Sequence, residues 1–170
     1  MNERALYCIK LAYASNTQYI AHMTQIDTIN ALRLMQSADA FRDRLSGAFS
    51  AIHGLSVNEY FLLKQLQRAP ENRLPRVELA KRMYVSASTV TRMVAPMEKI
   101  GLVDREVGAR DARLALVVLT KAGANKLEEA DATFALHAGY MFEDRWTDDE
   151  RAQLSELLSR LVAGAPANLT

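Results

Sequence analysis

The chain has 170 residues, of which 49% are hydrophobic, 24% charged and 7% aromatic, and its net charge is +1. This composition is that of an ordinary globular protein and excludes an intrinsically disordered chain, while the length allows one substantial domain with helical additions. The longest apolar runs, such as residues 114–119, are far too short to cross a bilayer, which takes about 20 residues. Because the sequence also begins without a signal-peptide pattern and holds a single cysteine, Cys8, we expect a cytoplasmic protein without disulfides or a membrane partner.

The charge is distributed unevenly along the chain. Residues 55–126 include 13 basic and 7 acidic side chains, a net charge of +6, whereas the rest includes 8 basic and 13 acidic side chains, a net charge of −5. Lys and Arg side chains that neutralise phosphates supply much of the affinity of proteins for nucleic acids. The basic middle of the chain therefore indicates that this part meets a polyanion.

The first predicted element is a long helix. Residues 1–22 lack caps and a sustained apolar period, so we assign them no structure. From residue 26 to about residue 52, most apolar residues recur three or four apart, as a helix with one buried stripe requires. These residues are Ile26, Ile29, Leu32, Met35, Phe41, Leu45, Phe49 and Ile52. Gly54 then ends the helix as a C-terminal cap.

A second helix begins with a capping box. Ser56 stands at the N-cap position and Glu59 follows three residues later, while Leu55 precedes the cap and can pack on Tyr60 as a hydrophobic staple. The helix is predicted to end near residue 68, because Ala-Pro-Glu-Asn at 69–72 breaks the pattern as a loop.

Two short helices joined by a tight turn come next. Pro75 suits the first turn of a helix that ends at Arg82, Tyr84 and Val85 form the turn, and Ser86 caps the following helix. That helix has an apolar stripe and a terminal glycine, which are Val90, Met93, Val94, Met97 and Gly101. The pair fits a DNA-reading helix-turn-helix, because the second helix exposes small polar residues near its N-terminus.

After this pair the pattern changes to strands. Residues 102–105 and 114–119 are predicted strands around the polar stretch 106–113, an arrangement typical of a β-hairpin. Thr120 then caps a helix that runs to about residue 142, and a second capping box, Thr147 with Glu150, begins a last helix. The apolar stripe of this last helix comprises Leu154, Leu157, Leu158, Leu161 and Val162.

The predicted fold is mainly α with a small β-hairpin wing, that is, a winged helix-turn-helix flanked by N- and C-terminal helices. The apolar stripes of the flanking helices are hard to bury against a small central module. A second copy of the same chain is the simplest partner for them, so we expect a homodimer.

Several short motifs follow one another between residues 55 and 123. They are Glu78-Leu79-Ala80, Val-Ser-Ala-Ser-Thr-Val-Thr-Arg from Val85 to Arg92, Met97-Glu98-Lys99-Ile100-Gly101-Leu102-Val103, the wing signature Asp111-Ala112-Arg113, and Leu119-Thr120-Lys121-Ala122-Gly123. In this order they resemble the multiple-antibiotic-resistance regulator (MarR) family of bacterial winged-helix proteins. The wing signature is the most specific of them.

The resemblance implies a homodimeric transcription regulator, in most relatives a repressor released by a small-molecule effector or by oxidation, that binds a pseudo-palindromic operator in double-stranded DNA. It also implies a division of the chain into five parts. These are an N-terminal extension (1–22), a dimerisation helix (23–54), the winged helix-turn-helix (55–120), C-terminal dimerisation helices (121–165) and a tail (166–170). No cofactor is implied.

Two residues depart from the family pattern where DNA binding is concerned. Ala112 stands where the family often has a second basic residue in the wing, which weakens the expected grip on DNA. Pro96 lies inside the recognition helix, where its ring removes one backbone hydrogen bond and can kink the axis.

The candidate DNA-contacting residues lie in the recognition helix and the wing. Those of the helix are Ser86, Ser88, Thr89, Thr91 and Arg92, and those of the wing are Arg110 and Arg113. Hydroxyls can bond phosphate or base edges, and an arginine can bond guanine with two parallel hydrogen bonds. Asp111 would repel phosphate and is better explained as an ion-pair partner that orients a wing arginine. Further cations that can attract phosphate are Lys64, Arg73, Arg76, Lys81 and Lys121.

Other kinds of site find little support in the sequence. Phe49, His53 and Tyr60 are the candidates for an effector pocket, although core residues have the same character. The three histidines are too dispersed in the sequence for a zinc site. Cys8 has few basic residues near it in the sequence that could lower the pKa of its thiol. We predict no catalytic residues, because no nucleophile with a base, phosphate-binding loop or carboxylate pair is evident.

Two other classes of protein remain open at this point. A winged helix that has lost useful DNA affinity could serve as a protein-interaction adaptor, and Ala112 and Pro96 leave room for that interpretation. A small enzyme that uses a cavity between the helices is the other. Steep salt dependence of duplex binding would argue against the adaptor.

Overall fold

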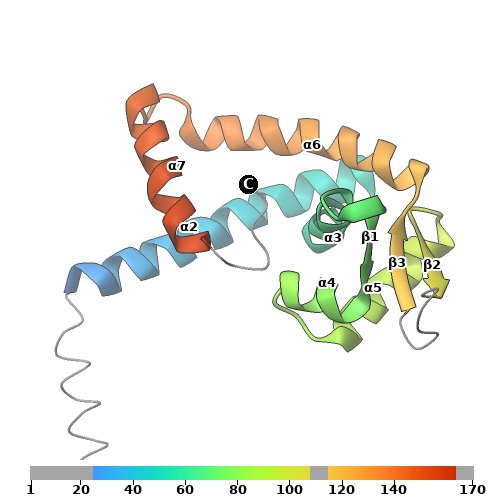
Figure 1. Ribbon diagram of the computed structural model, residues 1–170. Helices are drawn as coiled ribbons and strands as arrows, with labels where there is room; N and C mark the ends of the chain where they lie inside the picture. The colour runs from blue at the N-terminus through green and yellow to red at the C-terminus, as the bar shows by residue number, and fades with distance from the viewer. Residues whose placement is uncertain (1–24, 108–114, 164–170) are drawn as a thin grey trace, which may run out of the picture. The chain divides into compact units, whose positions relative to one another are not determined.

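The computed structural model describes residues 25–107 and 115–163, and its element order is the one expected of a winged helix (Figure 1). The helices are α2 (Gln25–Ala48), which continues as a π-helical turn (Phe49–His53), α3 (Val57–Gln67), α4 (Arg76–Arg82), α5 (Ala87–Lys99), α6 (Lys121–Phe142) and α7 (Asp148–Val162). The strands are β1 (Arg73–Pro75), β2 (Val103–Val107) and β3 (Ala115–Leu119). Within the described ranges, every helix is too short or too polar to span a membrane.

The chain divides into two compact units, one that ends at Arg42 and one that begins at Asp43. α2 runs from the first unit into the second, and the winged helix lies wholly in the second. In that second unit, α3 contacts α6 as well as α4, β1 and β3. Its side chains Leu62, Leu63 and Leu66 are completely buried, so α3 is the central helix of the core.

The helix ends follow the local signals in the sequence. Glu59 N–H donates to Ser56 Oγ at 3.2 Å and Ser56 N–H donates to Glu59 Oε2 at 2.7 Å, which confirms the first capping box. Gly54 and Gly101 adopt left-handed conformations, with φ of 64° and 74°, as glycines that end helices do. α5 runs unbroken through Pro96 to Lys99, and the Pro96 carbonyl accepts from Ile100 N–H at 3.2 Å.

The second capping box is also confirmed, at the start of α7. The Thr147 N–H donates to Glu150 Oε2 at 2.8 Å, and the Glu150 N–H donates to Thr147 Oγ1 at 3.2 Å. Hydrogen bonds from the backbone and then the hydroxyl of Thr147 lower the pKa of Glu150. The carboxylate form therefore makes the cap, and the cap is lost only as the pH falls through that lowered pKa.

The sheet has three antiparallel strands in the order β1-β3-β2. β2 pairs with β3 so that Val103 lies opposite Leu119, which confirms the predicted hairpin. β1 was not predicted, and Pro75 is its last residue rather than a residue of the first turn of α4. Pro75 lacks a backbone N–H, which suits the edge strand that β1 forms.

The flanking helices keep apolar side chains that the described chain leaves uncovered. Leu45 in α2 and Phe49 in the π-helical turn are buried, but Leu32 and Met35 are 55% and 65% exposed, and Ile52 in the turn is 64% exposed. Within a single chain, the expectation of one buried stripe from residue 26 to residue 52 therefore holds only for Leu45 and Phe49. In α7 no residue is buried, and Leu157 is 55% exposed. These exposed apolar side chains are available to pack against a partner, as the expected homodimer requires.

Candidate nucleic-acid interface

α4 and α5 form a helix-turn-helix whose turn is closed by the backbone. Met83 N–H donates to the Leu79 carbonyl at 2.9 Å, and Val85 N–H donates to the Ala80 carbonyl at 3.0 Å. Tyr84, between them, has a left-handed conformation with φ of 53° and is 72% exposed. On α5, Val90, Val94 and Met97 are buried and form the side that faces the core. The opposite side of α5 therefore faces solvent.

The N-terminal end of α5 bears a connected group of hydroxyls, called here the hydroxyl cluster (Ser86, Ser88 and Thr89). Ser86 Oγ accepts from Thr89 N–H at 3.2 Å, which confirms Ser86 as the N-cap. The same oxygen lies 2.8 Å from Ser88 Oγ and 2.9 Å from Thr89 Oγ1. Arg92 Nη2 is 3.5 Å from Thr89 Oγ1. The structure thus brings four of the five predicted helix residues into one exposed group.

The fifth predicted helix residue, Thr91, is engaged differently. Its hydroxyl donates to the Ala87 carbonyl at 3.0 Å and accepts a hydrogen bond of 3.2 Å from Arg76 Nη1. Arg76 was expected only as one of several cations that attract phosphate. Its contact with the recognition helix could not be found from the sequence, because the two residues belong to different helices.

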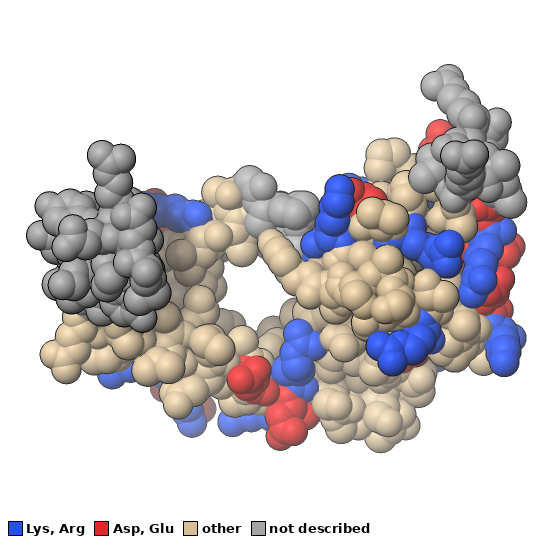
Figure 2. Space-filling model, turned by 90° about the horizontal axis from the view of Figure 1, so that it is seen from below, with Lys and Arg blue, Asp and Glu red and all other residues tan. Residues whose placement is uncertain are grey.

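The predicted phosphate-attracting cations fall into two groups. Lys64 pairs with Asp131 at 2.7 Å, and Arg73 pairs with Glu106 at 2.9 Å and also with Glu71. The other three, Arg76, Lys81 and Lys121, have no ion pair among the residues that the structure describes. Figure 2 views the molecule from below Figure 1, where α4 and α5 lie, and shows Lys and Arg side chains spread over this part.

The wing begins as a well-paired hairpin. Arg105 at its base pairs with Glu98 of α5 at 2.8 Å, which ties the wing to the recognition helix. The tip, residues 108–114, lies outside the described residues, and with it the predicted contacts Arg110 and Arg113 and their partner Asp111.

The end of the wing is fastened to α6 by Thr120 and Gly123. Thr120 Oγ1 donates to the Gly101 carbonyl at 2.7 Å, with the Leu102 carbonyl 3.1 Å away, and it accepts from Gly123 N–H at 3.0 Å. A Cβ atom on Gly123 would lie 2.0 Å from the Leu102 carbonyl oxygen. This contact explains physically why the motif needs threonine and glycine three residues apart.

The three candidate effector residues meet in one ring cluster (Phe49, His53, Tyr60 and Phe134). The ring centres of Phe49 and Tyr60 lie 4.9 Å apart, those of Phe49 and His53 5.8 Å, and those of Tyr60 and Phe134 5.4 Å. Phe49 is 0% exposed and Tyr60 3%, so both are core residues of this chain. His53 is only partly buried, and its Nε2 lies 2.8 Å from Thr133 Oγ1.

Asp131 of α6 connects the ring cluster with the winged helix. Its carboxylate accepts from the Tyr60 hydroxyl at 2.8 Å and from Lys64 Nζ at 2.7 Å. Burial and then the bond to Asp131 raise the pKa of Tyr60, so the phenol stays protonated and remains the donor. Both donors come from α3, so these bonds join α3 to α6.

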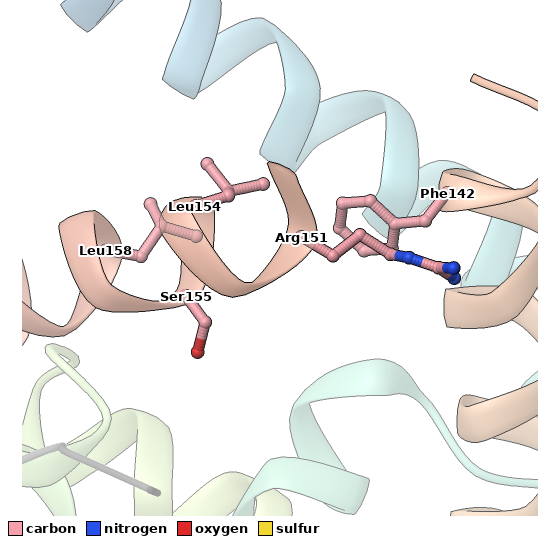
Figure 3. A pocket seen from close by; sticks show the side chains of 5 residues that line it. All are labelled: Phe142, Arg151, Leu154, Ser155 and Leu158. Carbon is pink, nitrogen blue, oxygen red and sulfur yellow. The ribbon is translucent and has the colours of Figure 1, made fainter. Parts of the chain in front are cut away.

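A pocket of about 270 Å³ lies away from the ring cluster, between the end of α6 and the side of α7 (Figure 3). It is lined by Phe142, Arg151, Leu154, Ser155 and Leu158, so it is mainly apolar. Arg151 forms an ion pair with Asp148 of its own helix. None of the predicted effector residues lines this pocket.

Among the described residues, no group of three or more His, Cys, Asp or Glu side chains is placed to hold a metal ion.

Comparisons with known proteins agree with this architecture. The model of the MarR family matches residues 55–114. The HTH-type transcriptional regulator YxaD of Bacillus subtilis is 31% identical over 107 residues, which are 63% of this chain and 73% of that protein. The chain belongs to the MarR family.

Two further proteins are similar over comparable lengths. The HTH-type transcriptional repressor YetL of B. subtilis is 29% identical over 114 residues, 66% of this chain and 67% of that protein. The crystal structure of the MarR-family regulator Sco3205 from Streptomyces coelicolor, in complex with DNA, has a TM-score of 0.71 and 28% identity, and the match covers 83% of this chain and 88% of that one.

Membership of the MarR family settles the class of protein. The family consists of transcriptional regulators rather than enzymes, and the chain has its winged helix-turn-helix. This protein is therefore a DNA-binding transcription regulator, as the motifs between residues 55 and 123 predict.

Proposed function

We propose that this chain acts in the cytoplasm as a homodimeric repressor, without a cofactor or catalytic activity, on a pseudo-palindromic operator in double-stranded DNA. The observation that carries the proposal is the surface of α5, which buries Val90 and Val94 and exposes Ser88 and Arg92 near its N-terminus. The major groove admits an α-helix, and in a helix-turn-helix the N-terminal residues of the second helix contact the base edges. We propose that Arg92 bonds a guanine and that the hydroxyl cluster bonds phosphate or bases.

The experiment that tests this function is binding of the full chain to a fluorescent duplex from the promoter of its own gene, measured by anisotropy. A scrambled duplex of the same length and composition is the control, and both are titrated with salt. Tight binding that prefers the promoter and weakens steeply with salt is the expected result. Equally weak binding to both duplexes would contradict the proposal and favour a protein-interaction adaptor.

The wing is proposed to hold DNA beside the recognition helix. Arg113 would enter the minor groove, where narrow A·T-rich segments concentrate negative potential, and Arg110 would contact the backbone. Asp111, two residues before Arg113, would orient one of these arginines through an ion pair.

Arg113→Ala is expected to weaken binding of the promoter duplex by about tenfold or more while the dimer stays intact, because a base contact made by arginine contributes about 1–3 kcal/mol. Anisotropy measures the affinity, and sedimentation of the free protein checks the dimer. Arg105→Ala serves as a comparison, since Arg105 belongs to the wing but pairs with Glu98. A variant at Arg113 that binds like the parent at physiological salt would show that the wing assignment is wrong.

The second chain of the dimer is proposed to cover the apolar side of α7. Leu157 and Leu161 of this side are 55% and 67% exposed, and Leu154 and Leu158 line the pocket next to Phe142. Burial of such side chains stabilises association by about 25 cal/mol per Å² of apolar surface. The exposed apolar residues of α2 are likewise proposed to be covered by the second chain.

A small-molecule effector is proposed to modulate DNA affinity at the ring cluster. Of the three candidate residues, His53 is the one that a ligand can reach without unpacking the core, because Phe49 and Tyr60 are buried. The bonds of Tyr60 and Lys64 to Asp131 support this location, since they join α3 of the winged helix to α6. A ligand that shifted this junction would change the angle between the two winged helices of the dimer.

A further inference from the structure

Arg76 reaches from the start of α4 to the recognition helix. Its Nη1 donates to Thr91 Oγ1 at 3.2 Å in a partly buried contact. The Thr91 hydroxyl donates its only hydrogen to the Ala87 carbonyl at 3.0 Å, within α5. In this arrangement the Thr91 hydroxyl therefore cannot donate a hydrogen bond to DNA. Its oxygen accepts the hydrogen bond from the Arg76 guanidinium.

The charge of Arg76 is not neutralised by its surroundings. Two other arginines of the winged helix pair with carboxylates, Arg82 with Glu78 at 3.0 Å and Arg105 with Glu98 at 2.8 Å. For Arg76 the described residues provide no such partner within 4.0 Å. A partly buried cation without a counter-ion is unfavourable, so its position calls for an anion from outside the chain.

We propose that Arg76 is a DNA phosphate contact and that Thr91 is the positioning residue that holds it, rather than a residue that reads bases. This inference rests on the proposed function of α5 as the recognition helix. A guanidinium has five N–H donors, and Thr91 occupies one, which leaves a fork that can bind two oxygens of one phosphate. In a helix-turn-helix the first helix crosses the DNA backbone while the second lies in the major groove, and Arg76 begins that first helix.

The test compares Arg76→Ala, Thr91→Val, the double variant and Arg76→Lys with the parent chain. Arg145→Ala is the matched control, because it removes one exposed cation between α6 and α7. The 22 residues of α6 separate Arg145 from the wing, a length of about 33 Å. Each protein is titrated by anisotropy against the promoter duplex and the scrambled duplex at several salt concentrations, and its urea midpoint is checked first.

A phosphate contact predicts that Arg76→Ala weakens binding of both duplexes by the same factor, at least about tenfold. The slope of log affinity against log salt should fall by about two for a dimer, since each lost contact removes about 0.9. Arg76→Lys, which keeps the charge, should keep the slope even if Arg76→Ala folds poorly. Thr91→Val should lower the affinity for DNA less than Arg76→Ala does. In the double variant it should cause no further loss of affinity.

Four results would overturn the inference. If the slope of log affinity against log salt is unchanged in Arg76→Ala, Arg76 does not contact phosphate. Thr91→Val could also lower the affinity in the Arg76→Ala background, and more for the promoter duplex than for the scrambled one. That result would show that Thr91 contacts bases. A parent chain that binds neither duplex would overturn the proposed function as well, whereas parental binding with an unaffected Arg76→Ala variant would overturn this inference alone.

Discussion

Replacement of Gly123 by alanine is expected to destabilise the winged helix by about 3 kcal/mol or more, at the upper end of what overpacking of a core costs. The new Cβ would lie 2.0 Å from the Leu102 carbonyl oxygen and 2.9 Å from Leu119 Cδ1. The Leu102 carbonyl oxygen cannot withdraw easily, because it belongs to the backbone next to β2 and lies within 3.1 Å of the Thr120 hydroxyl. The junction between the wing and α6 would have to open.

Gly139→Ala in the same helix is the matched control. No atom lies within 4 Å of the position that its Cβ would take, so the substitution should stabilise α6 by about 0.5–1 kcal/mol through the backbone alone. Urea unfolding followed by circular dichroism, at one protein concentration for both variants, measures the two effects. A Gly123→Ala variant as stable as the parent would show that the close approach to Leu102 is not required.

Leu157→Glu is expected to separate the dimer and, with it, to abolish tight binding of the promoter duplex. In the proposed dimer this side chain becomes buried, and a carboxylate buried without a partner costs several kcal/mol. Two linked winged helices bind two half-sites with an affinity that can exceed that of one by about 10²–10⁴-fold, so separation of the dimer should cost a comparable factor. Sedimentation of the free protein and anisotropy with the duplex measure the two losses.

Ala152→Glu is the control for the added charge. Ala152 is also exposed on α7, but the helical period places it opposite the apolar side that contains Leu154 and Leu157. This variant should remain dimeric and bind DNA like the parent, apart from a small effect of charge. A Leu157→Glu protein that stayed dimeric would contradict the proposed interface.

The parts of the fold that depend on neighbours in the sequence could be predicted from the sequence. Both capping boxes, Ser56 with Glu59 and Thr147 with Glu150, lie within one helical turn, and the structure confirms them. The apolar stripe of α5 could be predicted for the same reason. β1 was missed because it has three residues, ends in proline, and exists through its pairing with β3, which is more than 40 residues away in the chain.

The candidate site shows the same limit. The hydroxyl cluster was predicted because its members are consecutive or one turn apart on one helix. The bridge from Arg76 to Thr91 and the pairing of Lys64 with Asp131 could not be predicted, because they join residues of different helices. From charge counts alone, Lys64, Arg73 and Arg76 are equivalent candidates. Among the described residues, carboxylates pair with Lys64 and Arg73 but not with Arg76.

A dimer of this chain that reads a pseudo-palindromic operator with α5 and the wing should protect its own promoter symmetrically, and footprinting by hydroxyl radicals measures that protection. We expect two protected segments related by two-fold symmetry, with centres separated by about 10–10.5 base pairs or a multiple of that. Further protection in the minor groove on the outer side of each segment would mark the wings. Absence of protection at concentrations that saturate the anisotropy signal, or a single protected segment without symmetry, would show that the dimer does not read such an operator.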